Sequence, residues 1–422
     1  TIPSSQATLF TSSNASSKAH GESPSRPFDI PGPVSSNFRI LHCLRAPVGG
    51  LFRHVHDLAL GQAELGAEVG IVCDSRTGGS EIDVALSRLK DNCALGVTRL
   101  PMTRKPGLND WHTYRKIAKL GRNLNIDVLH GHGAKGGAYA RLAGRSLRKK
   151  KGTKVVYTPH GGVLHYSSST LFGKLYLAAE RKLAPLTDGF IFESMFAGNR
   201  YVELVGAPTC PARVIYNGLH RHEFYESLLA DDAADFVFVG ELRKLKGVDV
   251  FLEALAAQQN IFPGRAIIVG SGPDEKRFKR MARKLGLASR VIFSGPQPAR
   301  TAFVRARCVV VPSRAESAPY IVLEAAAAQM PMIVTNVGGI PELVGDVPMP
   351  LIPPGDVDAL ASQLRAFLAD PKPFLRRAVE LQKYVAQHFS VEAMTRDVVD
   401  FYISELGAGI HKLPELGSAT AS

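Results

Sequence analysis

Two carboxylates, Glu316 and Glu324, are the residues of this chain whose spacing most clearly suggests chemistry. Glu316 follows the apolar run Cys308–Val311, which predicts a strand. Glu324 lies two turns into the helix expected next, with Ser317 as its N-cap and Pro319 in its first turn. Ligands bind at the carboxyl ends of parallel strands, and a helix start attracts an anion. The pair therefore predicts a ligand with hydroxyl groups and a phosphate, such as a nucleotide sugar.

Further residues of the second half suggest a diphosphate. Gly270-Ser-Gly272-Pro follows a predicted strand and precedes a predicted helix, as a phosphate-binding turn does. It lacks the third glycine of the dinucleotide fingerprint, so a hydride-transfer cofactor is not expected. Arg243 and Lys246 follow the first predicted strand of this half, and both cations are candidates to hold a leaving diphosphate.

The first half offers glycines and histidines in equivalent positions. Gly49 and Gly50 lie between a predicted strand and a helix. His130 and His132 end another predicted strand and are expected to point to opposite faces of it, so that only one faces a ligand. His160 ends a third strand and enters a glycine-rich turn.

No group of residues has the spacing of a metal site. Asp356 and Asp358 resemble an acidic pair, but they begin a helical stretch after Pro353-Pro-Gly, so capping explains Asp356. We expect no metal and no cofactor.

Predicted strands and helices alternate along both halves, which favours α/β architecture with parallel sheets. The expected strands of the first half are Phe38–Leu44, Val69–Cys73, Val128–His130, Lys154–Thr158, Gly189–Phe192 and Val214–Ile215. Those of the second half are Phe236–Val239, Ala266–Val269, Val291–Ser294, Val309–Val311, Met332–Thr335 and Met349–Ile352.

A chain of 422 residues suits two domains. We predict two Rossmann-like doubly wound domains facing across a cleft, at residues 37–220 and 221–390. A helix over 391–407 could reach back to the first domain, between a disordered tail at 1–36 and a frayed tail at 408–422.

Composition indicates a reducing compartment. Cys43, Cys73 and Cys308 fall in apolar runs, where a thiol is usually a buried small hydrophobe, so no disulfide is expected. No apolar run reaches transmembrane length, and residues 1–36 do not resemble a signal peptide. We expect a cytoplasmic protein.

The net charge of +13 lies entirely in the first half. Residues 37–220 hold 26 basic and 13 acidic residues, whereas residues 221–407 hold 22 of each. One run without an acid includes Arg141, Arg145, Arg148 and Lys149–Lys151. Lys149, Lys150 and Lys151 are predicted to face an anionic membrane surface. Nucleic acid is not expected, because no aromatic residues interleave the run for base stacking.

The order and spacing of these motifs resemble family-4 glycosyltransferases of the GT-B fold over roughly Phe38–Leu406. The strongest features are Glu316-x7-Glu324, the Gly270 turn, the Lys246 loop and Thr335-Asn-Val-Gly-Gly-Ile-Pro-Glu342. One departure is Glu241, at a position where the family usually has arginine; Arg243 is the candidate substitute.

The resemblance implies retaining, metal-independent transfer from a nucleotide-diphosphate sugar. Glu316 would contact the transferred sugar, and Glu324 the ribose. Backbone amides around Ala318, Pro319 and Tyr320 would serve the phosphate or the sugar. Gly50 would approach the diphosphate. His132 would face the sugar from the acceptor side, where His160 is also expected.

The prediction is a peripheral transferase at the inner face of the membrane, acting on a lipid- or diphosphate-linked glycan in surface polysaccharide or glycolipid assembly. Two alternatives remain at this point. A nucleotide-sugar 2-epimerase of the same architecture would leave the one-sided charge unexplained. A non-catalytic nucleic-acid-binding protein would leave the donor-side motifs unexplained.

Overall fold

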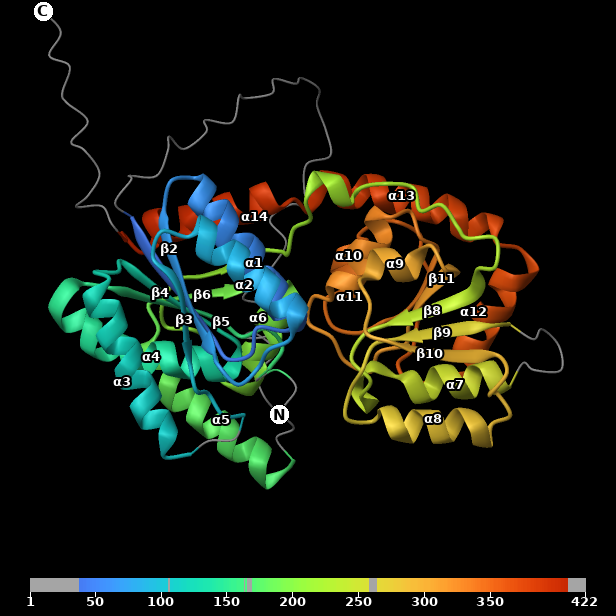
Figure 1. Cartoon of the computed structure of the whole chain (residues 1–422), viewed down its shortest axis with the longest axis horizontal. Helices are drawn as coiled ribbons and strands as arrows, with labels where there is room; N and C mark the ends of the chain where they lie inside the picture. The colour runs from blue at the N-terminus through green and yellow to red at the C-terminus, as the bar shows by residue number, and fades with distance from the viewer. Residues whose placement is uncertain (1–37, 105–106, 163, 165–168, 258–263, 409–422) are drawn as a thin grey trace, which may run out of the picture. The chain divides into compact units, whose positions relative to one another are not determined.

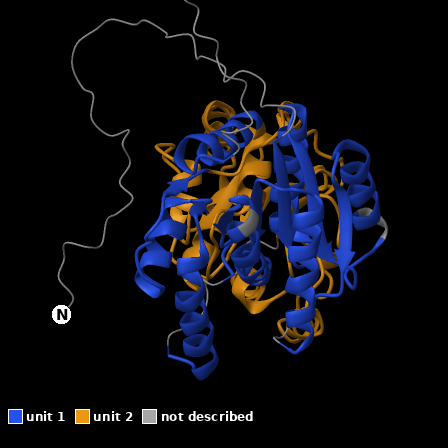
Figure 2. Cartoon of the chain, turned by 90° about the vertical axis from the view of Figure 1, so that its left-hand side faces the viewer, with its two compact units in different colours: residues 1–215, 392–422 blue, residues 216–391 orange. Residues whose placement is uncertain are grey.

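The computed structural model describes residues 38–408, except 105–106, 163, 165–168 and 258–263. The chain divides into two compact units, shown in separate colours in Figure 2. Unit 1 comprises Thr1–Ile215 and Glu392–Ser422, and unit 2 comprises Tyr216–Val391. The expected tails at 1–36 and 408–422 lie outside the described residues, except for Ala408.

Unit 1 is built on a seven-stranded parallel sheet in the order β3-β2-β1-β4-β5-β6-β7 (Figure 1). The strands are β1 (Arg39–Leu44), β2 (Glu68–Asp74), β3 (Gly96–Leu100), β4 (Val128–His132), β5 (Lys154–Thr158), β6 (Gly189–Phe192) and β7 (Ala212–Val214). The intervening helices are α1 (Gly49–Glu64), α2 (Ser80–Asn92), α3 (Asn109–Asn123), α4 (Gly133–Lys151), α5 (Leu171–Leu183) and α6 (Met195–Leu204). The strand order reverses between β1 and β4, and such a point is where doubly wound sheets bind ligands.

One strand of this sheet, β3, is not predicted by the sequence pattern. Its five residues, Gly-Val-Thr-Arg-Leu, are all half-buried, because β3 is an edge strand paired on one side with β2. A half-exposed edge needs no continuous apolar run, so the pattern that predicted the other strands is absent here.

Unit 2 has a six-stranded parallel sheet in the order β10-β9-β8-β11-β12-β13. The strands are β8 (Ala234–Val239), β9 (Ala266–Val269), β10 (Val291–Gly295), β11 (Ala306–Val311), β12 (Met332–Thr335) and β13 (Leu351–Ile352). Its helices are α7 (Val248–Ala256), α8 (Glu275–Lys284), α9 (Ala299–Phe303), α10 (Tyr320–Ala327), α11 (Ile340–Val344), α12 (Val357–Ala369) and α13 (Lys372–His388). Here the order reverses between β8 and β11.

The core of unit 2 has two layers, one on each face of the sheet. Along β11, Val309 and Val311 belong to one apolar cluster, and Cys308 and Val310 belong to the other. Successive strand residues point to opposite faces, so a strand buried on both faces is apolar throughout. Helices α7, α8 and α12 cover one face, and α9, α10, α11 and α13 cover the other (Figure 1).

The last described segment packs within unit 1. It consists of α14 (Val391–Asp400) followed by a π-helical turn at Phe401–Glu405. Arg213 of β7 donates to Asp400 at 2.7 Å and to Glu405 at 2.8 Å. Tyr402 is fully buried, and its hydroxyl lies 2.6 Å from His130 Nδ1. These contacts hold the end of the chain against the sheet of unit 1.

All five cysteines are free, and four of them, including Cys43, Cys73 and Cys308, are buried. Burial raises the pKa of Cys73 to about 11, so this thiol stays protonated at neutral pH. Within the described residues, no helix combines the length and the apolar composition needed to cross a membrane.

The basic run on α4 is only partly available to a partner. Arg141 is fully buried, donates to both oxygens of Glu180 at 2.5 and 2.9 Å, and lies 4.0 Å above the ring of Tyr157. Arg148 pairs with Asp188 at 2.8 Å. These two arginines hold α4 against its neighbours, so the grouping of the whole run as a free basic surface is wrong for them.

We predict that Arg141→Met lowers the free energy of unfolding by about 3–5 kcal/mol, because it leaves the buried Glu180 carboxylate unpaired. The control is Arg200→Ala, which removes an exposed pair with Glu203 and should cost at most about 1 kcal/mol. Denaturant unfolding followed by circular dichroism compares the two variants. Equal, small losses would show that the buried pair has no structural importance.

Candidate functional site

The loops after β8 and β11 bring Lys246 and Glu316 together at the carboxyl edge of the unit 2 sheet. Chain connections leave β8 and β11 in opposite directions, so their loops flank the reversal in strand order. Lys246 ends a short 3₁₀ turn, Lys244–Lys246, which precedes α7. The sequence predicted both residues, but only the topology makes them neighbours.

Lys246 and Glu316 form a bidentate ion pair. Lys246 Nζ lies 2.7 Å from Oε1 and 2.8 Å from Oε2 of Glu316. Ser313 Oγ also donates to Oε1 at 2.7 Å, and Glu316 itself is buried. The lysine side chain is 26% exposed and the glutamate 8%, so the cation is the partner that an incoming anion can reach. The carboxylate is fixed in place, with its charge compensated, before any ligand binds.

Two glycines allow these loops to approach so closely. A Cβ at Gly247 would lie 1.8 Å from the carbonyl oxygen of Pro312, and one at Gly338 would lie 2.1 Å from that of Glu316. Both have positive φ, 72° and 61°, a region that favours glycine. Gly339 N also donates to Ser317 O at 2.7 Å. The backbone that carries Glu316 is therefore clamped between the loops after β8 and β12.

The helix that carries Glu324 begins later than its sequence suggested. Helix α10 starts at Tyr320, with Pro319 at the N-cap position and no side-chain cap hydrogen bond. The expectation that Ser317 caps this helix is wrong, because Pro319 remains extended and itself occupies the N-cap position. Asn217 Nδ2 donates to Ala318 O at 3.1 Å and fixes this approach to the helix. Glu324 is half-buried on α10.

Asp356 caps α12, as predicted: its Oδ1 accepts a hydrogen bond from Ala359 N at 2.9 Å.

The other phosphate candidates surround the same edge. Gly270 and Gly272 lie directly after β9, where a Cβ would meet Gly240 O at 1.9 Å and Leu242 O at 2.5 Å, respectively. Their turn therefore packs on the loop after β8. Arg243 is the N-cap residue of the 3₁₀ turn that ends in Lys246, and its guanidinium lies 3.4 Å from Glu241. Arg243 is thus paired with Glu241, the acid that stands where the family usually has arginine.

In unit 1, the glycines at the start of α1 and the histidines of β4 lie where the strand order reverses, between β1 and β4. Gly49 begins α1 with φ of 66°, and both Gly49 and Gly50 are exposed. A Cβ at Gly49 would have no neighbour within 4 Å, so this helix start is open. Exposed helical N–H groups of this kind are suited to an anion.

His132 and His160 belong to a cluster of five imidazoles that sequence reasoning did not foresee. The members are His42 of β1, His54 of α1, His130 and His132 of β4, and His160 after β5. The expectation that His130 and His132 serve separate faces is wrong: residues two apart share a face, and their ring centroids lie 3.9 Å apart. His42 and His54 lie outside any recognisable motif, so local sequence patterns do not predict that they join the cluster.

Both ring nitrogens of His132 face other imidazoles. His132 Nε2 lies 2.9 Å from His42 Nδ1, and His132 Nδ1 lies 3.1 Å from His160 Nε2. Burial lowers the pKa of His42 to about 4 and that of His132 well below its usual value. These buried imidazoles are therefore neutral at physiological pH and available as hydrogen-bonding or ligating groups.

Family models match the two units in turn. The model described as Glycosyltransferase Family 4 matches residues 48–223, and that of Glycosyl transferases group 1 matches residues 221–387. Together they cover most of the chain, with both parallel sheets. The chain belongs to the family-4 glycosyltransferases and has the GT-B architecture of two Rossmann-like α/β units.

Known proteins agree with this assignment. The chain is 27% identical to glycogen synthase of Mycobacterium tuberculosis (strain ATCC 25618 / H37Rv), over 85% of this chain and 91% of that protein. It is 29% identical to the D-inositol 3-phosphate glycosyltransferase of Mycolicibacterium gilvum (strain PYR-GCK), over 71% and 68%. The fold is similar to that of Anabaena Alr3699/HepE in complex with UDP-glucose, with a TM-score of 0.72, 20% identity and coverage of 87% and 99%.

We predict that Glu316→Gln and Glu324→Gln each reduce transfer by on the order of 100-fold, because each removes a carboxylate from the candidate site of unit 2. Transfer is measured as release of nucleoside diphosphate, and thermal unfolding checks that the variants fold. Glu253→Gln, on the exposed side of α7, is the matched control and should be fully active. Full activity in both site variants would contradict the assignment.

Proposed function

We propose that this glycosyltransferase moves a sugar, with retention of configuration, from a nucleotide-diphosphate sugar to a lipid- or diphosphate-linked glycan. The process it serves would be surface polysaccharide or glycolipid assembly. The observation that carries the proposal is the Lys246–Glu316 pair at the carboxyl edge of β8 and β11. A fixed carboxylate and a reachable cation suit a ligand that has both hydroxyl groups and a diphosphate.

In this proposal the donor binds on unit 2. Lys246, assisted by Arg243, neutralises charge on the leaving diphosphate, and Gly270 and Gly272 allow close approach of the backbone. Glu316 contacts the transferred sugar, and Glu324 accepts from the ribose hydroxyls. Backbone amides of Ala318 and Tyr320 face the phosphate or the sugar, while Pro319, which has no N–H, shapes the turn.

Three hydrogen bonds to Glu316, two from Lys246 and one from Ser313, support an electrostatic role for this carboxylate. A carboxylate held by two cation contacts and a hydroxyl suits a fixed charge better than a group that takes up and releases a proton. That arrangement agrees with a retaining reaction in which the leaving diphosphate, not a glutamate, accepts the acceptor's proton. On unit 1, Gly49 and Gly50 would approach the diphosphate, and His132 and His160 would serve the acceptor side.

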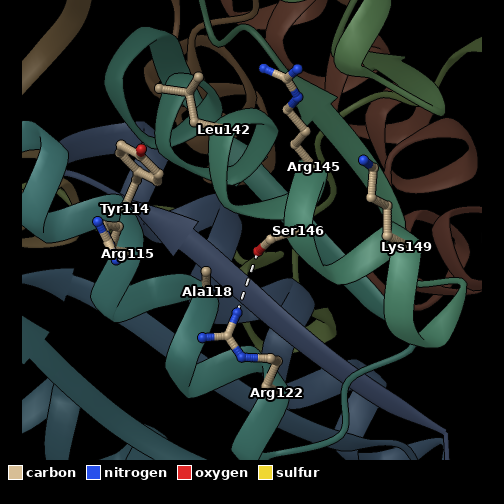
Figure 3. A pocket seen from close by; sticks show the side chains of 8 residues that line it. All are labelled: Tyr114, Arg115, Ala118, Arg122, Leu142, Arg145, Ser146 and Lys149. Carbon is tan, nitrogen blue, oxygen red and sulfur yellow. Dashed lines mark hydrogen bonds between the residues drawn. The ribbon is translucent and has the colours of Figure 1, made fainter.

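We further propose that unit 1 docks on an anionic membrane through a basic groove between α3 and α4. The groove has a volume of about 430 Å³, and Figure 3 shows its lining side chains. Arg115 and Arg122 come from α3, and Arg145 and Lys149 come from α4. None of the eight lining residues is acidic. Four cations in a groove lining that holds no acid suit a phosphate headgroup.

An exposed aromatic residue supports the same surface. Trp111 is 50% exposed on α3, and the guanidinium of Arg115 lies 4.3 Å from its ring centroid. Tryptophan beside basic residues is typical of interfacial helices, where the indole enters the headgroup region while the cations meet lipid phosphates. Lys149, Lys150 and Lys151 end α4 beside this groove.

Family membership favours transfer over the two alternatives. A nucleotide-sugar 2-epimerase would use the same donor edge but has no need of a basic groove on unit 1. A nucleic-acid-binding protein has no need of the Lys246–Glu316 pair. Thermal shift separates them: a nucleoside diphosphate should stabilise the transferase, whereas stabilisation by an oligonucleotide alone would indicate the binding protein.

The direct experiment is a screen of nucleotide sugars with membrane extract, scored by release of nucleoside diphosphate. The HepE structure holds UDP-glucose, which makes uridine donors the first to test. Release that requires the extract supports transfer to a membrane-derived acceptor. Free conversion of the sugar without any acceptor would favour the epimerase.

We predict that transfer needs no added Mg²⁺ or Mn²⁺, because Lys246 supplies the positive charge that these ions supply elsewhere. Activity after brief treatment with EDTA should match that of the untreated enzyme. Abolition by EDTA, with recovery on adding Mg²⁺ or Mn²⁺, would show the prediction to be wrong.

We predict that replacing Lys149, Lys150 and Lys151 by alanine weakens binding to anionic vesicles by on the order of 100-fold at low salt. Each basic residue near an anionic leaflet contributes about 1 kcal/mol, screened over a Debye length of about 8–10 Å. Vesicle co-sedimentation measures this loss, and high salt should release the parent protein.

The matched control replaces three exposed cations of unit 2, Lys276, Arg280 and Lys284 of α8, which lie outside the proposed surface. This variant should bind as the parent does. Equal binding by the Lys149–Lys151 variant and the parent, or no preference of the parent for anionic over neutral vesicles, would contradict docking.

A further inference from the structure

The histidine cluster of unit 1 contains a chain of three imidazoles between two oxygen acceptors. At one end, Gln62 Oε1 lies 2.8 Å from His42 Nε2. At the other, Glu193 Oε2 lies 2.6 Å from His160 Nδ1. His132 lies between His42 and His160, at 2.9 and 3.1 Å. The chain therefore has four polar contacts.

The chain is one hydrogen short of its four contacts. Each contact needs one N–H, and an imidazole with a single N–H supplies one, so three such rings supply three. His42 and His160 direct their protons outward, to Gln62 and Glu193. His132 can then complete only one of the two inner contacts, and the other brings two nitrogen lone pairs together. A cation at that contact would remove the conflict.

A third imidazole identifies the kind of cation. His54 adjoins the contact between His132 and His160, and one ring nitrogen from each of the three lies within 4.8 Å of the others. The rings of His54 and His160 meet edge to face, with centroids 4.7 Å apart. A proton is shared by two nitrogens, whereas a metal ion uses three or four. The convergence of three therefore favours a metal ion.

The surroundings match those of metal-binding histidines. Such residues usually present their second nitrogen to a carboxylate, which fixes the tautomer and the ring orientation, and Glu193 does this for His160. His160 also has φ of 49°, a conformation uncommon for a residue other than glycine. Two Zn–N bonds of about 2.0–2.1 Å at a tetrahedral angle place nitrogens about 3.3 Å apart, close to the 3.1 Å between His132 and His160.

We propose that His54, His132 and His160 bind a divalent d-block cation, with Zn²⁺ as the first candidate and Glu193 as the residue that positions His160. Neutral imidazole ligands select Zn²⁺, Co²⁺, Ni²⁺ or Cu²⁺ over Mg²⁺ and Mn²⁺, which prefer oxygen. The ion would order the histidines at the carboxyl end of the unit 1 sheet. It is distinct from any ion at the donor diphosphate and does not depend on the proposed transfer reaction.

The test is metal binding by the full chain without an affinity tag. The protein is stripped with a chelator and titrated with Co²⁺, whose visible absorption reports nitrogen coordination, and then with Zn²⁺ by calorimetry. One equivalent is expected to bind and to raise the thermal unfolding temperature. His54→Ala should weaken binding by at least about 100-fold, and Glu193→Gln by about 10–100-fold while keeping all three imidazoles.

The control is a His220→Ala/His222→Ala variant, which removes an imidazole pair stacked at 5.3 Å in unit 2. It should bind one equivalent as the parent does. Circular dichroism checks each fold, and if His54→Ala does not fold, Glu193→Gln decides.

Two results would overturn the proposal. One is no Co²⁺ or Zn²⁺ binding by the stripped parent, which would indicate that the Gln62 amide turns over and completes the chain with its own N–H. The other is binding lost in the His220/His222 variant and retained by the His54 and Glu193 variants.

Discussion

The Lys246–Glu316 ion pair is the contact on which the candidate site of unit 2 depends. It joins the loops after β8 and β11, which diverge to opposite sides of the sheet, and it requires both loops to come within hydrogen-bonding distance. Gly247 makes this possible, because a Cβ there would strike the carbonyl of Pro312, and Gly338 likewise lets the loop after β12 pack against the carbonyl of Glu316. The pair, together with the hydrogen bond from Ser313, also holds a nearly buried carboxylate in one orientation.

The two units use the same sheet topology for different chemistry. In each, the strand order reverses once, and the candidate residues follow the two strands beside that reversal. Unit 2 places a cation and a carboxylate there, as suits a charged donor. Unit 1 places an open helix start and neutral imidazoles. The shared architecture supplies the position, and the residues after each strand supply the function.

Two kinds of basic residue occur on α4: some stabilise the packing of the helix, and others line a groove at the surface. Sequence alone shows that the excess of basic residues lies in the first half, but it treats all members of the α4 run alike. The structure buries Arg141 against Glu180 and pairs Arg148 with Asp188, whereas Arg145 and Lys149 line an open groove with Arg115 and Arg122. Arg141 and Arg145 lie one helical turn apart but differ in environment, because one side of α4 packs against the rest of unit 1 and the other side faces solvent.

The sequence by itself determined the parallel α/β class and most strands, and it singled out Glu316, Lys246 and Glu324 as candidates, because buried parallel strands are apolar runs and their ends carry polar motifs. It did not determine the half-exposed strand β3, the late start of α10 at Tyr320, or the ion pair itself. Only the tertiary structure decided the histidine cluster, since His42, His54, His132 and His160 come from separate elements. Strand order and loop closure bring such residues together, and neither can be read from local spacing.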